Sequence, residues 1–122
     1  MKKSLLILVG AVASVSLTFA AEKGEWWQYK TIEGSYRIYS GALGEEQPPT
    51  TNDRKISFVV TGSVAKGMFD SMSPDIKQGC SQDKKYHERQ KGNVSCVHDS
   101  EGYTCHFGFD LRTRASISGG YC

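Results

Sequence analysis

The sequence predicts a small α+β domain in which one antiparallel β-sheet carries a single helix on one face and is stapled by disulfide bonds. Three observations lead to this prediction. Short runs of strand-like composition recur along the chain, and only one region shows clear helical spacing of apolar residues. Four cysteines all lie in the second half of the chain. The length of 122 residues allows one domain at most.

The N-terminus has the features of an export signal. A Lys-Lys pair after the first methionine precedes an uncharged apolar run over residues 5–19, and Thr18 and Ala20 place small residues before a cut after Ala20. The run is short for a membrane span, which needs about 20 apolar residues. We therefore expect a cleaved signal peptide over 1–20 and a single exported domain over 21–122. The short basic start indicates a bacterial protein of the periplasm or the medium.

The charge of the chain excludes two classes of partner. The whole sequence has a formal net charge of +2, with 15 basic and 13 acidic side chains. Cleavage after Ala20 leaves 102 residues and removes two lysines, so 13 basic side chains remain against 13 acidic ones. A neutral protein has no electrostatic preference for nucleic acid or for an anionic membrane. We therefore expect no nucleic-acid partner. We also expect no stable membrane insertion, because the sequence has no second long apolar run.

A β-hairpin is expected at the start of the mature chain. Residues 26–32 and 35–40 are rich in aromatic and β-branched side chains, and a Glu-Gly pair between them is typical of a turn. Alternate side chains of a strand point to opposite faces. Trp26 and Trp27 therefore cannot both enter one core, and we expect one of them to be partly exposed.

A loop, a third strand and the helix follow this hairpin. Proline, threonine, asparagine and aspartate crowd into Glu45–Arg54, which predicts an exposed loop. Residues 55–61 predict the clearest core strand. Apolar residues recur at helical spacing over 64–72, with Ser63 as the expected N-cap. A second short helical piece is expected from Pro74 to Gly79.

The sequence after the helix predicts three further strands, which completes the order β-β-β-α-β-β-β. Residues 94–98 and 103–112 form the clearest hairpin, and residues 116–118 form a short final strand. Whether residues 86–89 are also a strand stays open. In a hairpin with a four-residue loop, Cys96 faces Cys105 directly, whereas a three-residue loop would shift the register by one and separate them.

The hairpin register favours one disulfide pairing out of three. We expect Cys96–Cys105 and, by elimination, Cys80–Cys122. The alternative is sequential pairing, Cys80–Cys96 with Cys105–Cys122.

Residues suited to catalysis or metal binding are few. Oxidised cysteines offer no thiolate, no Gly-x-Ser-x-Gly motif occurs, and the cysteines and histidines lack zinc-site spacing. Phosphate loops and dinucleotide fingerprints are also missing from the sequence. We therefore predict no enzyme, no metal and no cofactor. A small hydrolase around His98, His106 and Asp110 is the weakest alternative.

The surplus of aromatic residues and the polar loop indicate a binding surface. The residues predicted to form it are Trp26, Trp27, Tyr29, Tyr39, Glu45, Glu46 and Arg54. In size, export signal and disulfides, the chain is similar to small exported inhibitor, immunity and accessory proteins of bacteria. We predict a periplasmic or secreted protein that binds another protein, acting as an inhibitor or immunity-type protein. The alternative is an envelope module that stacks cell-wall glycan on the same aromatic residues.

Overall fold

The computed structural model describes residues 25–120 and residue 122. The predicted signal peptide over 1–20 lies outside these residues. The chain divides into two units, Met1–Thr31 and Ile32–Cys122, and the second contains all the strands described. Among the described residues, no helix is long and apolar enough to cross a membrane.

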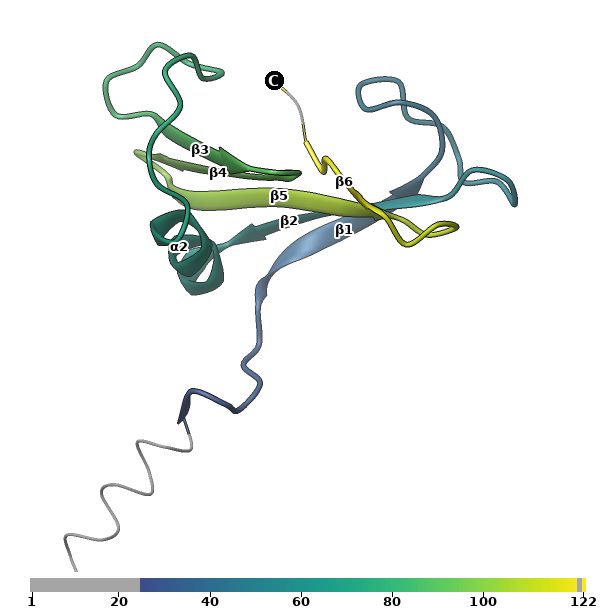
Figure 1. The fold of residues 1–122 in the computed structure, drawn as a ribbon, viewed down its shortest axis with the longest axis horizontal. Helices are drawn as coiled ribbons and strands as arrows, with labels where there is room; N and C mark the ends of the chain where they lie inside the picture. Colours follow the sequence, from purple (N-terminus) through teal and green to yellow (C-terminus); the bar gives the residue numbers. More distant parts are fainter. Residues whose placement is uncertain (1–24, 121) are drawn as a thin grey trace, which may run out of the picture. The chain divides into compact units, whose positions relative to one another are not determined.

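The second unit is an antiparallel sheet with one helix on it (Figure 1). Its strand order is β1-β2-β5-β4-β3, and β6 pairs with β5. The elements are β1 (Glu33–Tyr39), β2 (Lys55–Thr61), α2 (Gly62–Asp70), β3 (His87–Lys91), β4 (Val94–Asp99), β5 (Gly102–Asp110) and β6 (Ser116–Ile117). The predicted fold class is confirmed.

The predicted first strand is wrong. Residues 26–32 belong to no strand, and β1 instead begins at Glu33, where a turn was expected. Gly34 lies within β1 opposite Val60, and a Cβ at Gly34 would lie only 2.5 Å from the Val59 carbonyl oxygen. A segment of strand-like composition forms a strand only where another strand supplies hydrogen-bond partners for its backbone. Residues 33–39 have β2 as that partner, whereas none of the described strands pairs with residues 26–32.

The cysteine hairpin has the predicted register and disulfides. Cys96 lies opposite Cys105 in the β4–β5 pair, with a Cα–Cα distance of 4.1 Å. The strands run closer to the turn than expected, because Asp99 already pairs with Gly102. Gly102 has a φ of 116°, a left-handed conformation that glycine adopts without strain. The second disulfide joins Cys80 to Cys122, so the preferred pairing is confirmed.

The helix begins immediately after β2 and buries one face against the sheet. Gly62 has a φ of 71° and turns the chain from the strand into the helix, with Thr61 at the N-cap. Ser63 lies inside the helix, so its expected capping role is wrong. Ala65 and Phe69 are the buried helical residues. The buried core around them also contains Val60, Met72, Cys96 and Cys105.

The predicted helical piece over 74–79 is not formed. The backbone N–H of Ile76 donates to the carbonyl oxygen of Glu88 in β3, at 2.8 Å. The Cys80 N–H donates to the Glu88 carboxylate at 3.0 Å. These bonds to the edge of the sheet replace the i to i−4 bonds that a second helix would need.

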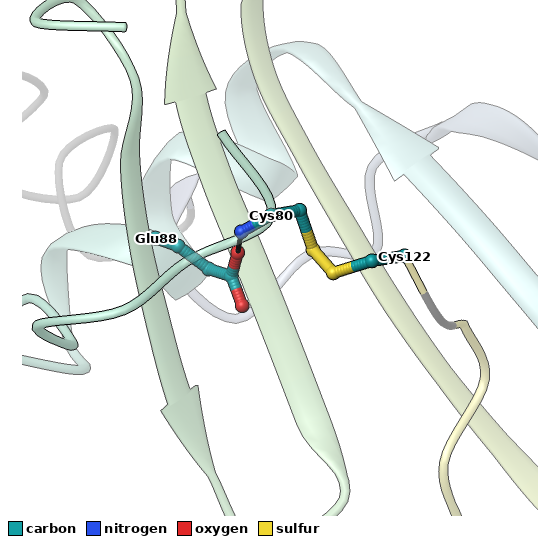
Figure 2. Close-up of side chains that lie close together, drawn as sticks. All are labelled: Cys80, Glu88 and Cys122. Carbon is teal, nitrogen blue, oxygen red and sulfur yellow. Dashed lines mark hydrogen bonds between the residues drawn. A yellow bond between two sulfur atoms is a disulfide. The ribbon is translucent and has the colours of Figure 1, made fainter. Parts of the chain in front are cut away.

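A C-terminal strap, formed by Ser118, Gly119, Gly120 and Cys122, lies against the sheet on the face opposite α2. A Cβ at Gly119 would lie 2.2 Å from the Phe107 carbonyl oxygen. At Gly120 it would lie 2.9 Å from Cγ of His106. Only glycine permits this close approach to β5. The Cys80–Cys122 disulfide ties the end of the strap to the segment before β3 (Figure 2).

Candidate functional site

Four aromatic rings lie together on the face of the sheet that carries α2, where Phe107 packs against the core beneath the helix and the other three lie beyond it. The register aligns Tyr36 of β1 with Phe58 of β2, and Phe58 with Phe107 of β5. Phe109 lies two residues further along β5 on the same face. The helix packs over the other end of this face, against Val60 and the Cys96–Cys105 disulfide. We call Tyr36, Phe58, Phe107 and Phe109 the aromatic shelf.

The rings of the aromatic shelf contact one another and are open to solvent. The Phe58 ring centroid lies 5.1 Å from that of Phe107, 6.5 Å from that of Phe109 and 6.4 Å from that of Tyr36. Tyr36 is 66% exposed and Phe109 40% exposed, while Phe58 and Phe107 are half-buried. Because the rings stand on paired strands and pack on each other, a partner would bind them with little cost of ordering. Contiguous exposed apolar surface is typical of interaction sites, which makes the shelf the candidate site of this chain.

The aromatic residues predicted near the N-terminus are exposed but are not part of the shelf. Trp26 is 80% exposed, Trp27 is 68% exposed, and Tyr29 is fully exposed. All three belong to the first unit. The two tryptophans do not both enter one core, as expected, and because the predicted strand over 26–32 is not formed, both are exposed.

Tyr39 is a buried residue and not a surface binding residue. It is 2% exposed, and the Lys55 ammonium and the Arg37 guanidinium lie 5.6 Å and 5.9 Å from its ring centroid. Burial raises the pKa of the Tyr39 hydroxyl above its ordinary value of 10.0. Its inclusion in the predicted surface is therefore corrected.

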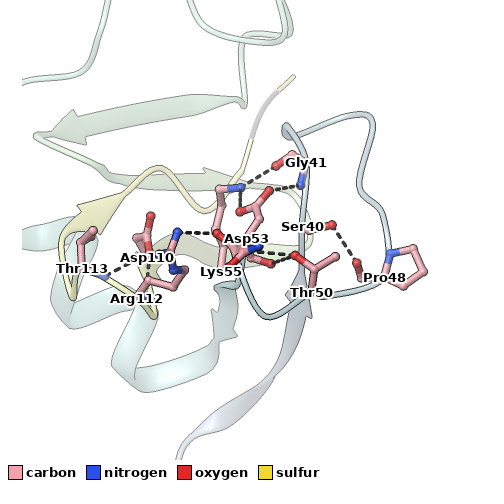
Figure 3. A network of polar contacts seen from close by, with 10 residues as sticks. Ser40, Gly41, Pro48, Thr50, Asp53, Lys55, Asp110, Arg112 and Thr113 are labelled. Atoms are coloured by element: carbon pink, nitrogen blue, oxygen red, sulfur yellow. Dashed lines mark hydrogen bonds and ion pairs between the residues drawn. The ribbon is translucent and has the colours of Figure 1, made fainter.

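The predicted loop is exposed, but hydrogen bonds fix its two ends (Figure 3). The Asp53 carboxylate accepts from the Gly41 N–H at 2.8 Å and from the Lys55 ammonium, which also donates to the Gly41 carbonyl at 2.9 Å. These contacts, the Gly41 amide first, lower the pKa of Asp53 below its ordinary value of 3.8. The Ser40 hydroxyl donates to the Pro48 carbonyl at 2.7 Å. The loop is thus held by its own Asp53 and by the flanking Ser40 and Lys55 side chains.

The remaining predicted residues, Glu45, Glu46 and Arg54, make separate contacts. Glu46 pairs with Arg37 at 2.7 Å, and hydrogen bonds from backbone amides hold its pKa below the ordinary value of 4.5. Glu45 and Arg54 are exposed. The Arg54 carbonyl accepts from the Leu111 N–H at 2.8 Å, which fixes the end of β2 beside β5.

A cleft of about 340 Å³ lies on the opposite face of the sheet. Arg37, Glu46, Ser57, His106 and Gly120 are among its lining residues. His106 is half-buried beneath Gly120, and burial lowers its pKa below the ordinary value of 6.5. The imidazole is therefore neutral at physiological pH.

The residues of the hydrolase alternative are not brought together. His98 lies on the helix side of the sheet, where its ring stacks on Tyr103 at 3.9 Å and contacts Phe69. His106 lies on the other side. The Asp110 carboxylate accepts from the backbone N–H groups of residues 112 and 113 and shapes the turn before β6. These three side chains do not form one site.

The only cluster with metal-ligand atoms in the described part of the chain is the one at the Cys80–Cys122 disulfide (Figure 2). The Glu88 carboxylate lies beside it and accepts from the Cys80 N–H and from the Tyr86 hydroxyl at 2.5 Å. Burial and this bond raise the pKa of Tyr86 to about 12. Sulfur atoms joined to each other are not thiolate ligands. The arrangement anchors the strap to β3.

Comparisons of the chain with protein-family models, curated proteins and solved structures find no match.

Sequence reasoning missed the aromatic shelf, although part of its signal was visible. Phe107 and Phe109 alternate in β5, and Phe58 lies in the strand predicted to be the core. Alternation shows that these side chains share a face, but it does not show how much of that face a helix covers. The nine residues of α2 are too few to reach them all.

Proposed function

We propose that this chain is a non-enzymatic binding protein of an oxidising compartment, periplasmic or secreted, and that it binds another protein through the aromatic shelf. The observation that carries this proposal is the contiguous set of exposed and half-buried aromatic rings on a paired sheet. Exposed aromatic side chains are enriched among the residues that dominate protein interfaces. An inhibitor or immunity-type protein is the form of this function that we favour.

The chemistry of the shelf supports a protein partner over a glycan. Three of its four rings are phenylalanines, which have no polar group to bond sugar hydroxyls. Leu111, which is 42% exposed, adds further apolar surface close to the end of β5. Apolar side chains of a partner would gain from burial there, whereas a sugar ring would also need hydrogen bonds.

The compartment is supported by the two disulfides and by the export signal expected from the sequence. Disulfides persist in oxidising compartments and are rare in the cytosol.

The test is saturable binding to a partner captured from envelope and medium extracts. Phe109→Ala should weaken one-to-one binding about tenfold or more, because it removes an exposed ring at the edge of the shelf. Val64→Ala is the matched control, since Val64 is an exposed apolar residue of α2 that lies outside the shelf. Equal affinity of the folded Phe109→Ala protein for its partner would overturn the use of the shelf.

A second experiment tests whether the N-terminal tryptophans bind the partner and whether the chain binds glycan instead. A Trp26→Ala/Trp27→Ala variant should retain partner affinity if the shelf is the binding site. Retention of the wild-type protein on insoluble peptidoglycan, lost in the tryptophan variant, would instead assign the function to glycan binding. Loss of the partner's activity upon binding would show that the protein is an inhibitor.

A further inference from the structure

The two edges of the sheet differ in what covers them. At the β3 edge, the Ile76 N–H bonds to the Glu88 carbonyl, and the Cys80–Cys122 disulfide lies beside this contact. At the other edge, β1 has β2 as its one strand partner among the described residues. Six of the seven residues of β1 are exposed or half-exposed. A long exposed edge strand is a template for pairing with another chain.

Backbone direction shows which residues of β1 are free to pair. Just before β2, the Arg54 carbonyl accepts from the Leu111 N–H. In β2, the N–H and C=O groups of even-numbered residues therefore point toward β5, and those of odd-numbered residues point toward β1. The opposing groups of β1 are then the odd-numbered ones, since Arg37 lies opposite Ser57. The N–H and C=O groups of Gly34, Tyr36 and Ile38 therefore point outward. Ser40, the next in this series, bonds instead to Gln47 at 2.8 and 2.9 Å, and this contact closes the edge beyond Tyr39.

The free edge is complementary to itself in one antiparallel register. If Ser35 faces the partner's Ser35 across a two-fold axis, Glu33 lies directly opposite the partner's Arg37. In this register Gly34 lies opposite the partner's Tyr36, and Ile32 opposite the partner's Ile38. Charge meets opposite charge, the aromatic ring covers the glycine, and aliphatic residues meet each other.

The charged pairs are placed where side chains approach most closely. Glu33 and Arg37 are odd-numbered, so they occupy the non-hydrogen-bonded positions of the new pair. The Arg37 side chain is 59% exposed. Its bond to Glu46 uses one of five guanidinium N–H donors. A shift of the register that aligns Arg37 with the partner's Ser35 would lose both charge pairs.

We propose that two copies of this chain pair through β1, antiparallel and centred on Ser35, to form one continuous sheet. Residues directly opposite in an antiparallel pair share a face, so both aromatic shelves lie on the same side of this sheet. Phe58 and Phe109 stay open to a partner protein. The dimer does not rest on the proposed function, and Tyr36 is the one shelf residue that lies in the paired strand.

A charge exchange tests the pairing. Glu33→Arg and Arg37→Glu should each weaken dimerisation about tenfold, because each places two pairs of like charges face to face. The double variant restores opposite charges and should recover most of the wild-type affinity. Within one strand these residues are about 13 Å apart, so recovery can arise only between two chains. Sedimentation equilibrium of the oxidised protein measures the mass.

A cysteine cross-link tests the register. In Ser35→Cys, the two new thiols face each other as Cys96 and Cys105 do within the chain, so air oxidation should give a covalent dimer. Ser63→Cys, on the exposed surface of α2, is the control for random collisions. Peptide mapping confirms that the two native disulfides are intact in both variants.

The outcomes distinguish this proposal from the proposed function. A monomer mass for the wild-type protein at all concentrations, or no recovery in the charge-exchanged variant, would overturn the dimer and leave shelf binding standing. A dimer whose affinity for a partner protein does not depend on Phe109 would overturn shelf binding alone.

Discussion

His106 is the residue whose environment gives the clearest pH dependence. Burial beneath Gly120 lowers its pKa below 6.5, so the folded chain binds fewer protons than the unfolded chain in that range. The stability that comes from burying the neutral imidazole is fully present above pH 6.5 and is lost as the pH falls below that value. We expect wild-type stability to fall between pH 7.5 and pH 5, and His106→Gln to reduce this slope, as measured by urea denaturation at each pH. An unchanged slope in the variant would contradict the buried, neutral state of this imidazole.

At the scale of elements, two glycines should respond in opposite ways to the same substitution. A Cβ at Gly67, inside α2, meets no atom within 4 Å, whereas a Cβ at Gly119 would overlap the backbone of Phe107. Gly67→Ala should stabilise the protein by about 0.5–1 kcal/mol, because alanine restricts the unfolded chain and favours the helix. Gly119→Ala should destabilise it by about 1–3 kcal/mol, because the strap must move off β5.

Thermal and urea denaturation of both glycine variants measure these effects. Each variant serves as the control for the other, since both add one methyl group. A destabilised Gly67→Ala protein would show that a methyl group at this position of the helix meets an obstacle. A neutral Gly119→Ala protein would show that the strap does not press on β5.

At the scale of the whole molecule, the Cys80–Cys122 disulfide closes the longest covalent loop. It joins residues 42 apart in sequence, against nine for Cys96–Cys105. Because the entropy lost by the unfolded chain grows with loop length, replacing both Cys80 and Cys122 by serine should cost about 4 kcal/mol. By the same argument, the Cys96–Cys105 disulfide, which closes a shorter loop, contributes about 2–3 kcal/mol to the free energy of unfolding. Urea denaturation of the serine variant measures the loss.

A loss well below 1 kcal/mol for the Cys80 and Cys122 pair would contradict this role. It would mean that the contacts of Gly119 and Gly120 with β5 hold the strap without the covalent bond.

The sequence by itself determined the parts of the structure that depend on residues close together in the chain. The β4–β5 hairpin has its predicted register because the alternation of its strands leaves little freedom across a short turn. That register places Cys96 opposite Cys105, and the other pair follows by elimination. The helix over Gly62–Asp70 follows from the spacing of its apolar residues.

The tertiary structure alone decided which strand-like segments find partners and which apolar faces are covered. Residues 26–32 and 33–39 have similar compositions, but β2 pairs with the second segment only. Residues 74–79 form no helix because Glu88 accepts from the backbone N–H groups of Ile76 and Cys80 instead. The aromatic shelf and the free edge of β1 exist because α2 ends after nine residues and no described strand lies outside β1. Coverage of a face or an edge depends on contacts between residues far apart in sequence, and local composition does not encode it.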